Sequence, residues 1–309
     1  MTPTRHLLEI DDLSPGELVR ILDLCETPTA PDSAVSGELA GRSVGLYFEK
    51  PSLRTRHSSE AAVTRLGGHA VTFTNAEVGI GTREPAADIA QVLSGFHAAL
   101  GARVFDHQIL EDMAAASSIP IVNLLSDLGH PCQALADLRT MRSELGDLAG
   151  RTVCWVGDYN NVARSLSIGA AMCGMQVRIA SPVGYGPTGV DVDRLRAAGH
   201  DTAPFVTTHA AEAAEGADAV HTDVWASMGQ EEESEARRRA FEGFQVDDRV
   251  MAAAASTAIF MHCLPAHRGE EVSASVADGP QSRMFAQAHN RMHAMIGLFR
   301  WLVEIEAIQ

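Results

Sequence analysis

The chain has 309 residues, of which 46% are hydrophobic, which is typical of a water-soluble protein with two domains of ordinary size. No apolar run approaches the roughly 18 residues that a membrane-spanning helix needs. The formal net charge of -16 argues against nucleic acid or an anionic membrane as a partner, because no basic run offsets it. An anionic substrate therefore requires a local cluster of arginines.

The five cysteines are widely spaced and include no C-x-x-C pair, which argues against a disulfide framework or a zinc site. Free thiols fit a reducing compartment. The first residues lead into acidic side chains rather than an apolar signal segment, so we expect a cytoplasmic protein. The cysteines are Cys25, Cys132, Cys154, Cys173 and Cys263.

The first half of the chain alternates short apolar strands with helix-like segments. A helical lead-in occupies residues 1–40, with Ser14 and Pro15 as a helix start and a turn-rich spacer at 27–31. Alternation of this kind predicts a parallel sheet covered by helices. We expect strands at 43–48, 69–73, 119–123 and ending at 102–105, and helices from Pro51 to the Gly67-Gly68 stop, at 88–96 and at 132–145.

A polar, glycine-containing turn at 148–151 predicts a domain boundary, after which the alternation repeats. A charged run at 231–239 is typical of a solvated helix face, and 290–308 has the apolar spacing of a packing helix. The predicted fold class is α/β: two domains, each a mainly parallel sheet flanked by helices, spanning 1–148 and 149–287. Strands are expected at 152–156, 176–180, 219–221 and 258–261.

Residues 48–56, Phe-Glu-Lys-Pro-Ser-Leu-Arg-Thr-Arg, join the first strand to the next helix. Helix N-termini attract anions through their free amides and their positive dipole end. Hydroxyls at Ser52 and Thr55 and guanidiniums at Arg54 and Arg56 add donors that match a phosphate. On these residues alone, an N-cap followed by a solvated basic turn is an equally good interpretation.

Polar residues also follow other strands, at the strand ends where parallel sheets usually bind ligands. Arg103 ends a strand, and His130 and Gln133 open a helix, although a histidine beside a proline is also typical of a cap. The segment 156–161 lacks the G-x-G-x-x-G of a dinucleotide site, which disfavours a nicotinamide-dependent oxidoreductase. Asn161 at its end also suits a helix cap.

Later strand ends carry a carboxylate at Asp223 and a thiol at Cys263, and Arg291 opens the last helix. His262, Cys263 and His267 lack the ligand spacing of a recognisable metal site, so no metal is expected.

Seven of these segments, in order along nearly the whole chain, resemble the aspartate/ornithine carbamoyltransferase family. They are Phe-Glu-Lys-x-Ser-x-Arg-Thr-Arg at 48–56, Arg103, His-Pro-Cys-Gln at 130–133, Gly-Asp-x-Asn-Asn-Val-Ala at 157–163, Asp-x-x-x-Ser-Met-Gly at 223–229, His-Cys-Leu-Pro at 262–265 and Asn-Arg at 290–291.

The resemblance implies a carbamoyl phosphate-binding first domain, to which a C-terminal helix at 288–309 returns, and an ornithine-binding second domain. It assigns the catalytic roles to Arg103, His130, Asp223 and Cys263. The carbamoyl phosphate site it implies comprises Ser52, Leu53, Arg54, Thr55, Arg103, His130, Gln133, Cys263, Leu264 and Arg291. The ornithine site it implies comprises Asn161, Asp223, Ser227 and Met228.

The implied reaction transfers the carbamoyl group of carbamoyl phosphate to the side-chain amine of L-ornithine, giving L-citrulline and phosphate without a cofactor. Asp223 suits the α-ammonium of ornithine. Putrescine or another amine as acceptor, or a non-catalytic carbamoyl phosphate-binding member, stay as alternatives. The family resemblance also implies a homotrimer and a place in arginine biosynthesis.

Three positions depart from the family pattern. Leu53 stands where a threonine is common, so that only its backbone amide can serve a phosphate. Gly79 replaces a polar side chain that reaches carbamoyl phosphate in relatives, and Tyr159 replaces a glycine. None of the three departures removes a charged group.

Overall fold

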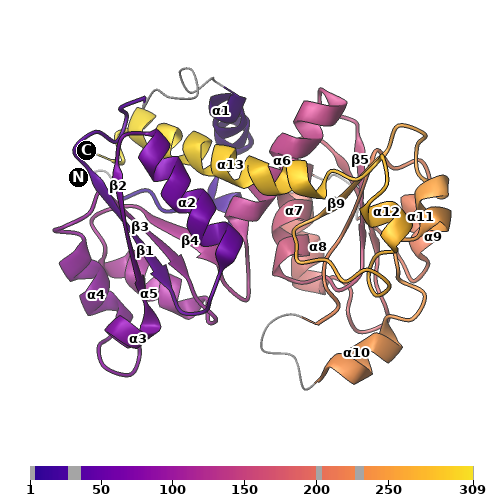
Figure 1. Ribbon diagram of the computed structural model, residues 1–309, viewed down its shortest axis with the longest axis horizontal. Helices are drawn as coiled ribbons and strands as arrows, with labels where there is room; N and C mark the ends of the chain where they lie inside the picture. Colours follow the sequence, from indigo (N-terminus) through magenta and orange to yellow (C-terminus); the bar gives the residue numbers. More distant parts are fainter. Residues whose placement is uncertain (1–3, 27–35, 200–203, 227–232, 309) are drawn as a thin grey trace. The chain divides into compact units, whose positions relative to one another are not determined.

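The structure, a computed structural model, describes residues 4–26, 36–199, 204–226 and 233–308. It consists of two compact units, one formed by residues 1–136 with 289–309 and the other by residues 137–288. Each unit contains one parallel sheet with helices packed on it (Figure 1). The predicted α/β class is therefore confirmed.

The sheet of the first unit has the strand order β2-β1-β3-β4, and all neighbouring strands are parallel. The central strands β1 and β3 are almost wholly buried, as expected for a parallel sheet covered on both faces. Helices α4 and α5 pack beside each other on one face of this sheet (Figure 1). The strands are β1 (Ser43–Phe48), β2 (His69–Thr74), β3 (Ala99–Arg103) and β4 (Ile121–Leu125).

The helices of the first unit begin with a short 3-10 turn and α1. The predicted helix start at Ser14 is confirmed, and reciprocal hydrogen bonds join Ser14 and Glu17 there. The C-terminal helix α13 contributes all its residues from 289 onward to this unit, as predicted for a returning helix. The helices are η1 (Ile10–Asp12), α1 (Pro15–Glu26), α2 (Leu53–Arg65), α3 (Asn75–Val78), α4 (Ala86–Leu93), α5 (Gln108–Ala116), α6 (Pro131–Leu145, shared) and α13 (Met284–Glu304, shared).

The sheet of the second unit has the strand order β7-β6-β5-β8-β9, again all parallel. Its core joins apolar residues of β5, β8 and β9 to alanines and methionines of the covering helices. The strands are β5 (Thr152–Val156), β6 (Gln176–Ala180), β7 (Phe205–Thr207), β8 (Ala219–Thr222) and β9 (Ile259–His262), and the helices are α7 (Asn161–Met172), α8 (Gly189–Ala197), α9 (Ala210–Ala214), α10 (Ser234–Ala240), α11 (Asp248–Ala253) and α12 (Ala274–Ala277).

The chain passes between the two units inside helices rather than inside loops. The first passage falls after Ala136 within α6, and the second falls after Ala288 within α13. The domain boundary predicted at residues 148 and 149 lies in the turn between α6 and β5 and stays a prediction.

Three predicted features were wrong in detail. The last helix begins at Met284 rather than at 290, so Arg291 lies inside it instead of opening it. The charged run at 231–239 forms α10 in its described part, but Arg237 is buried there rather than solvated. The helix after β5 is capped by Asn160, not Asn161. The spacer predicted at 27–31 lies outside the described residues.

Among the described residues, no helix combines the length and the apolar content that a bilayer crossing demands.

Candidate active site

The first unit gathers its polar residues where three neighbouring strands end. β1, β3 and β4 lie side by side, and parallel strands place their carboxyl ends at one edge of the sheet. The loop after β1 leads to Thr55, β3 ends at Arg103, and the loop after β4 ends at His130. The strand order alone thus brings together side chains that are far apart in the sequence.

Helix α2 starts at this edge without a side-chain cap. Ser52 is the N-cap in extended conformation, and its side chain makes no capping hydrogen bond. The hydroxyl and the first backbone amides are therefore available to an anion. Arg54 is half-buried in the same turn, whereas the guanidinium of Arg56 pairs with Glu60 at 2.9 Å.

Thr55 is the centre of a buried group of five side chains, which we call the anion cluster. Its Oγ1 accepts hydrogen bonds from Arg103 Nη1 at 3.1 Å and Arg291 Nη2 at 2.7 Å. Arg291 Nη1 also donates to Gln133 Oε1 and lies 3.4 Å from His130 Nε2. Each of the five side chains is at most 7% exposed. Two guanidiniums are thus held in fixed directions by neutral side chains.

The cluster keeps His130 uncharged. Burial holds the pKa of His130 well below its usual value, and the charges of Arg291, Arg103 and Lys50 lower it further. At neutral pH the imidazole is therefore a neutral hydrogen-bonding group beside two permanent cations. An imidazole of this kind can donate to a developing oxyanion without exchanging its proton first.

Lys50 adds a third cation that the sequence analysis did not include in the site. Its Nζ lies 4.1 Å from the centroid of the Phe105 ring. Burial, followed by the charge of Arg103, lowers the pKa of Lys50 to about 8. Its place in the Phe-Glu-Lys segment was the available signal, but a lysine there is equally typical of a solvated turn.

Local irregularities set the directions of Arg103 and His130. The pairing of β3 with β4 shifts register between Ala102 and Arg103, and such a bulge redirects the side chain next to it. The loop before His130 is held by Asn123, whose Nδ2 donates to Ser126 Oγ at 3.1 Å and to the Gly129 carbonyl at 3.2 Å. Buried hydrogen bonds in this loop fix the position from which His130 enters the cluster.

In the second unit, polar residues likewise follow the carboxyl ends of three neighbouring strands. β5, β8 and β9 are neighbours, and the strand order reverses direction next to β5, where doubly wound sheets bind ligands. Asn160 and Asn161 follow β5, Asp223 follows β8, and Cys263 follows β9.

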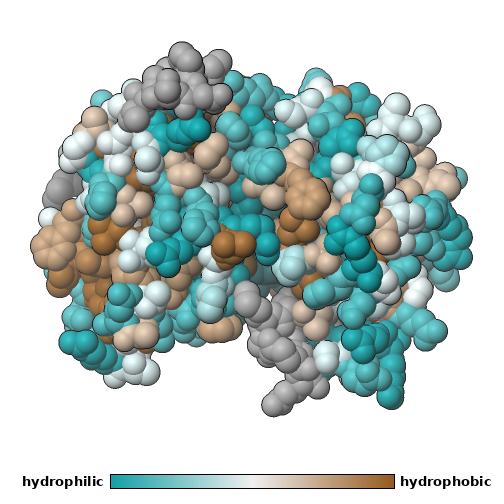
Figure 2. Space-filling view, viewed as in Figure 1, coloured by the Kyte–Doolittle hydropathy of each residue, from teal (hydrophilic) through white to brown (hydrophobic). Residues whose placement is uncertain are grey.

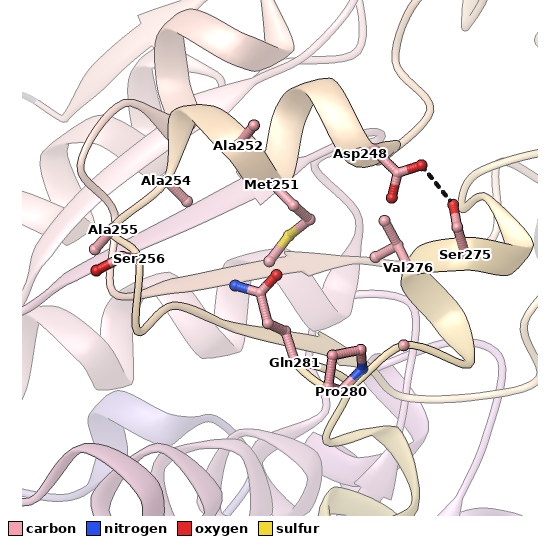
Figure 3. A pocket seen from close by; sticks show the side chains of 11 residues that line it. Asp248, Met251, Ala252, Ala254, Ala255, Ser256, Ser275, Val276, Pro280 and Gln281 are labelled. Carbon is pink, nitrogen blue, oxygen red and sulfur yellow. Dashed lines mark hydrogen bonds between the residues drawn. The ribbon is translucent and has the colours of Figure 1, made fainter.

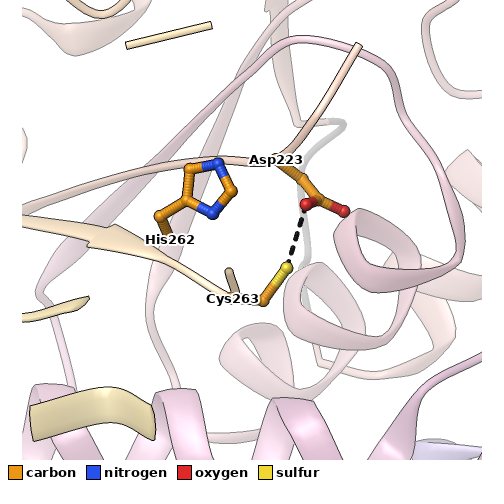
Figure 4. A group of neighbouring side chains, drawn as sticks. All are labelled: Asp223, His262 and Cys263. Carbon is orange, nitrogen blue, oxygen red and sulfur yellow. Dashed lines mark hydrogen bonds between the residues drawn. The ribbon is translucent and has the colours of Figure 1, made fainter. Parts of the chain in front are cut away.

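Asp223 and Cys263 are in direct contact (Figure 4). Cys263 Sγ donates to Asp223 Oδ1 at 3.0 Å, and Asn160 Nδ2 donates to Oδ2 at 3.0 Å. The Val224 amide also bonds Oδ1, at 2.8 Å. Asp223 is 7% exposed, so these donors hold a nearly buried carboxylate in one orientation. A carboxylate fixed in this way can bind and orient an ammonium group.

His262 lies in the same group of side chains, but both of its ring nitrogens are engaged. Nδ1 accepts from the Leu264 amide at 2.9 Å, which assigns the proton to Nε2, and Nε2 donates to Glu271 Oε1 at 3.1 Å. His262 therefore positions the turn at Leu264, whose φ is 61°, a conformation rare outside glycine. The ligand atoms of Asp223, His262 and Cys263 lie within 4.8 Å of one another, but with His262 so engaged they do not form a ready metal site.

The remaining predicted residues have different outcomes. Asn161 is half-buried, and its Oδ1 accepts from the Val162 amide at 3.0 Å. Cys263 and Leu264, which we assigned to carbamoyl phosphate, belong to the second unit, whereas the anion cluster belongs to the first. Ser227 and Met228 lie outside the described residues.

Arg237 is a buried residue that the sequence analysis missed. It donates to Asp158 Oδ2 at 2.7 Å and to the carbonyl of Trp225 at 3.0 Å. Burial raises the pKa of Asp158, and the contact with Arg237 opposes that rise. Asp158 follows β5 and Trp225 follows β8, so Arg237 ties the loop after β5 to the loop that carries Asp223. Its position in a charged run gave no signal of burial.

The three departures from the family pattern have local explanations or none. Gly79 has a φ of 69°, and a Cβ there would lie 3.0 Å from that of Arg83, so a side chain at this position would be strained. Tyr159 is buried, which raises its pKa to about 12. Leu53 is 70% exposed at the start of α2, and nothing in the structure explains it.

A cavity of about 380 Å³ lies away from these strand ends, between α11 and α12 (Figure 3). Alanines, Met251 and Val276 form much of its wall, and the bond from Ser275 Oγ to Asp248 Oδ2 at 2.8 Å closes one side. Among the described residues that line it, Asp248 is the one titratable side chain, and it is engaged in that bond.

Two family models match the chain consecutively. Residues 5–143 match the aspartate/ornithine carbamoyltransferase, carbamoyl-P binding domain, and residues 149–302 match the aspartate/ornithine carbamoyltransferase, Asp/Orn binding domain.

Relatives match over almost the full length. A protein of Acidothermus cellulolyticus named ornithine carbamoyltransferase is 48% identical over 302 residues, covering 97% of both chains. One of Halobacterium salinarum, named ornithine carbamoyltransferase, catabolic, is 44% identical and covers 96% of this chain and 99% of its own. The solved structure of ornithine carbamoyltransferase from Pyrococcus furiosus is 40% identical, with a TM-score of 0.91 over 96% of both chains.

Proposed function

The chain belongs to the aspartate/ornithine carbamoyltransferase family, and we propose that it transfers the carbamoyl group of carbamoyl phosphate to the side-chain amine of L-ornithine, yielding L-citrulline and phosphate. The observation that carries this proposal is the anion cluster, in which two buried guanidiniums share the Thr55 hydroxyl beside a neutral His130. Carbamoyl phosphate presents both a phosphate and a carbonyl oxygen to such donors.

We assign the phosphate to the start of α2. The Ser52 hydroxyl, the amides of Leu53 and Arg54, and the Thr55 side chain offer donors at a helix N-terminus, where anions are stabilised. Arg103, His130, Gln133 and Arg291 then face the carbamoyl end. Amine attack places negative charge on the carbonyl oxygen, and loss of one preorganised donor to such an oxyanion typically costs about 100- to 1,000-fold in rate.

We assign ornithine to the ends of β5, β8 and β9. Asp223 offers its fixed carboxylate to the α-ammonium, with Asn161, Ser227 and Met228 completing the site. The side-chain amine must lose a proton before it attacks, which costs roughly 4 to 5 kcal/mol at pH 7 for an amine of pKa ~10.4. That first proton passes to solvent. Cys263, bonded to Asp223, helps to orient the neutral amine, and the leaving phosphate takes up the second proton, which the attacking nitrogen loses as phosphate departs. We also assign Cys263 and Leu264 to the binding of the carbamoyl group.

The test is formation of a ureido product by the purified protein from carbamoyl phosphate, with ornithine, putrescine, N-acetylornithine and aspartate offered separately. Citrulline formed selectively is the expected result. Arg54→Ala should remove most of this activity, while Arg249→Ala, in the second unit, should retain it.

Each other outcome has a defined meaning. Preference for putrescine would show that Asp223 does not select ornithine through its α-ammonium group. Tight binding of carbamoyl phosphate without product from any amine would identify a non-catalytic binding protein and overturn the proposed reaction.

We infer that the reaction serves arginine biosynthesis in the cytoplasm. The family resemblance and the five cysteines, none joined in a disulfide within the described chain, support this inference. The direction of flux is open to measurement, because one relative is named as catabolic. Loss of arginine prototrophy on deletion of the gene, restored by supplied citrulline, is the expected outcome.

We also infer a homotrimer. Hydrophobic side chains gather over β2 and α4, at the left edge of Figure 2. Val71 in β2, Val92 in α4 and Phe96 just after α4 are 37%, 54% and 69% exposed, and Val71 and Val92 line an apolar cavity of about 240 Å³. An exposed apolar face of this kind is typical of a subunit interface. Phe96→Glu should therefore yield monomers in light scattering.

A further inference from the structure

The loop that follows β9 carries a second group of polar side chains, formed by His267, Glu270 and Glu271. One ligand atom from each residue lies within 4.8 Å of the others. His267 is about half exposed, and its carbonyl accepts from the Glu270 amide at 2.9 Å, so the loop turns back on itself at this point.

Glu271 is the unusual member of this group, because it is fully buried yet only half satisfied. Its Oε1 accepts from His262 Nε2 at 3.1 Å and from the His267 amide at 2.5 Å. Its Oε2 is also buried, and no donor in the described part of the chain bonds to it. A buried carboxylate oxygen without a partner is costly, so a missing positive ligand is the simplest account of it.

The unsatisfied oxygen faces His267. Nδ1 of His267 lies 3.7 Å from Glu271 Oε2, which is too long for a hydrogen bond. Zinc-type metal–ligand bonds of about 2.0 to 2.2 Å place two tetrahedral donors roughly 3.4 Å apart. The pair is therefore near the spacing of two ligands of one ion.

We propose that His267, Glu270 and Glu271 bind a divalent transition-metal cation such as Zn²⁺. Imidazole nitrogen and carboxylate oxygen are both ligand types that such ions accept, with water able to take the remaining position. Glu270 now pairs with Arg238 at 3.0 Å, but both side chains are exposed by more than a third. An ion pair in that environment is weak, so Glu270 is able to turn from Arg238 to a metal ion.

The site connects to the proposed active site through a short chain of hydrogen bonds. Glu271 Oε1 holds His262 Nε2, and His262 Nδ1 holds the Leu264 amide. A cation on Glu271 Oε2 would make His262 the outer hydrogen-bond partner of a metal ligand, and such outer partners orient the ligands they bond. Binding at this loop should therefore restrain the turn that carries Cys263 and Leu264.

The test uses Co²⁺ as a spectroscopic probe on metal-stripped full-length protein in a Cys263→Ser background. That background removes the thiol of Cys263, which precedes the loop, so that sulfur of this residue cannot contribute to the cobalt spectrum. One bound Co²⁺ per chain, displaced by Zn²⁺, is the expected result.

Single substitutions locate the ion. His267→Ala and Glu270→Gln should each raise the Kd for Co²⁺ at least roughly tenfold, a change seen even when an outer partner of a metal ligand is removed. His209→Ala, another exposed histidine of the same unit, is the matched control and should bind as before. Absence of Co²⁺ binding at millimolar concentration, or binding that survives both substitutions, would overturn the proposal. Far-ultraviolet circular dichroism checks that each variant is folded.

Discussion

At the scale of single residues, Thr55 is the point on which the anion cluster depends. Its hydroxyl accepts from both Arg103 and Arg291, and all three side chains are buried. Removing this acceptor leaves two guanidiniums without a shared anchor and removes a donor to the proposed phosphate. Loss of the hydroxyl should therefore lower both the activity and the stability of the protein.

Thr55→Val keeps the shape and removes the hydroxyl. We expect kcat/KM to fall on the order of 100-fold, and the free energy of unfolding to fall by about 1.5 to 3 kcal/mol, as for hydrogen bonds to charged groups. Steady-state kinetics and urea denaturation measure the two effects. Thr64→Val, an exposed threonine of the same helix, should leave both near the wild-type values, and an active Thr55→Val enzyme would contradict the assigned role.

Lys50 makes the proposed binding of carbamoyl phosphate dependent on pH. Because its pKa is lowered to about 8, Lys50 is mostly charged at pH 7 and mostly neutral at pH 9. The KM for carbamoyl phosphate should rise through this interval by roughly threefold to tenfold, as expected when an attraction of about 1 kcal/mol is lost. In Lys50→Arg, which stays charged, the rise should be smaller, and equal profiles in the two enzymes would exclude this role.

At the scale of elements, the sequence predicted strands better than it predicted helix boundaries. β6 begins and ends at the predicted residues because its apolar run is short and flanked by clear breaks. The start of α13 was missed because the apolar spacing we used begins at Asn290, whereas the first turns contain the buried polar Gln287 and the exposed Phe285. The burial of Gln287 depends on bonds to Asp137 and His221, which are distant in sequence.

Side-chain directions in the candidate site were predictable only in part. The strand order explains why residues from separate motifs gather at one edge of each sheet. The alternation of strands and helices along the sequence had predicted parallel sheets with such edges. The bulge beside Arg103 and the lowered pKa of His130 depend on tertiary contacts that local spacing does not encode. The burial of Arg237 likewise depends on Asp158, 79 residues away.

Arg237→Ala tests the contribution of α10. Its removal leaves Asp158 in a mostly buried position without its guanidinium partner. We expect a loss of about 3 kcal/mol in the free energy of unfolding, the lower end for a broken buried pair because the Asp158 side chain keeps 18% exposure. Urea denaturation measures it, and Arg239→Ala, an exposed arginine of the same helix, is the control. A loss below 1 kcal/mol would place this pair among surface ion pairs.

At the scale of the whole molecule, the first unit is built from both ends of the chain. Arg291 comes from the last helix, and the other members of the anion cluster come from residues 55–133. The C-terminal segment 289–309 is therefore part of the first unit rather than an appendage of the second.

A chain truncated after Ala288 should lose binding of carbamoyl phosphate, because it lacks Arg291 and the helix that covers the first unit. Calorimetry with the truncated protein measures this loss. Adding residues 289–309 as a peptide should restore part of the binding, whereas the same peptide with Arg291→Gln should restore less. Full binding by the truncated chain would show that α13 does not complete the site.

The position of Arg291 also governs when the protein can become functional during its synthesis. The N-terminal part of a chain leaves the ribosome first, and domains commonly fold in that order. Here the strands of the first unit emerge early, but the anion cluster is complete only after the segment with Arg291 has emerged. An unfinished or prematurely terminated chain therefore has no complete anion cluster with which to sequester a reactive metabolite.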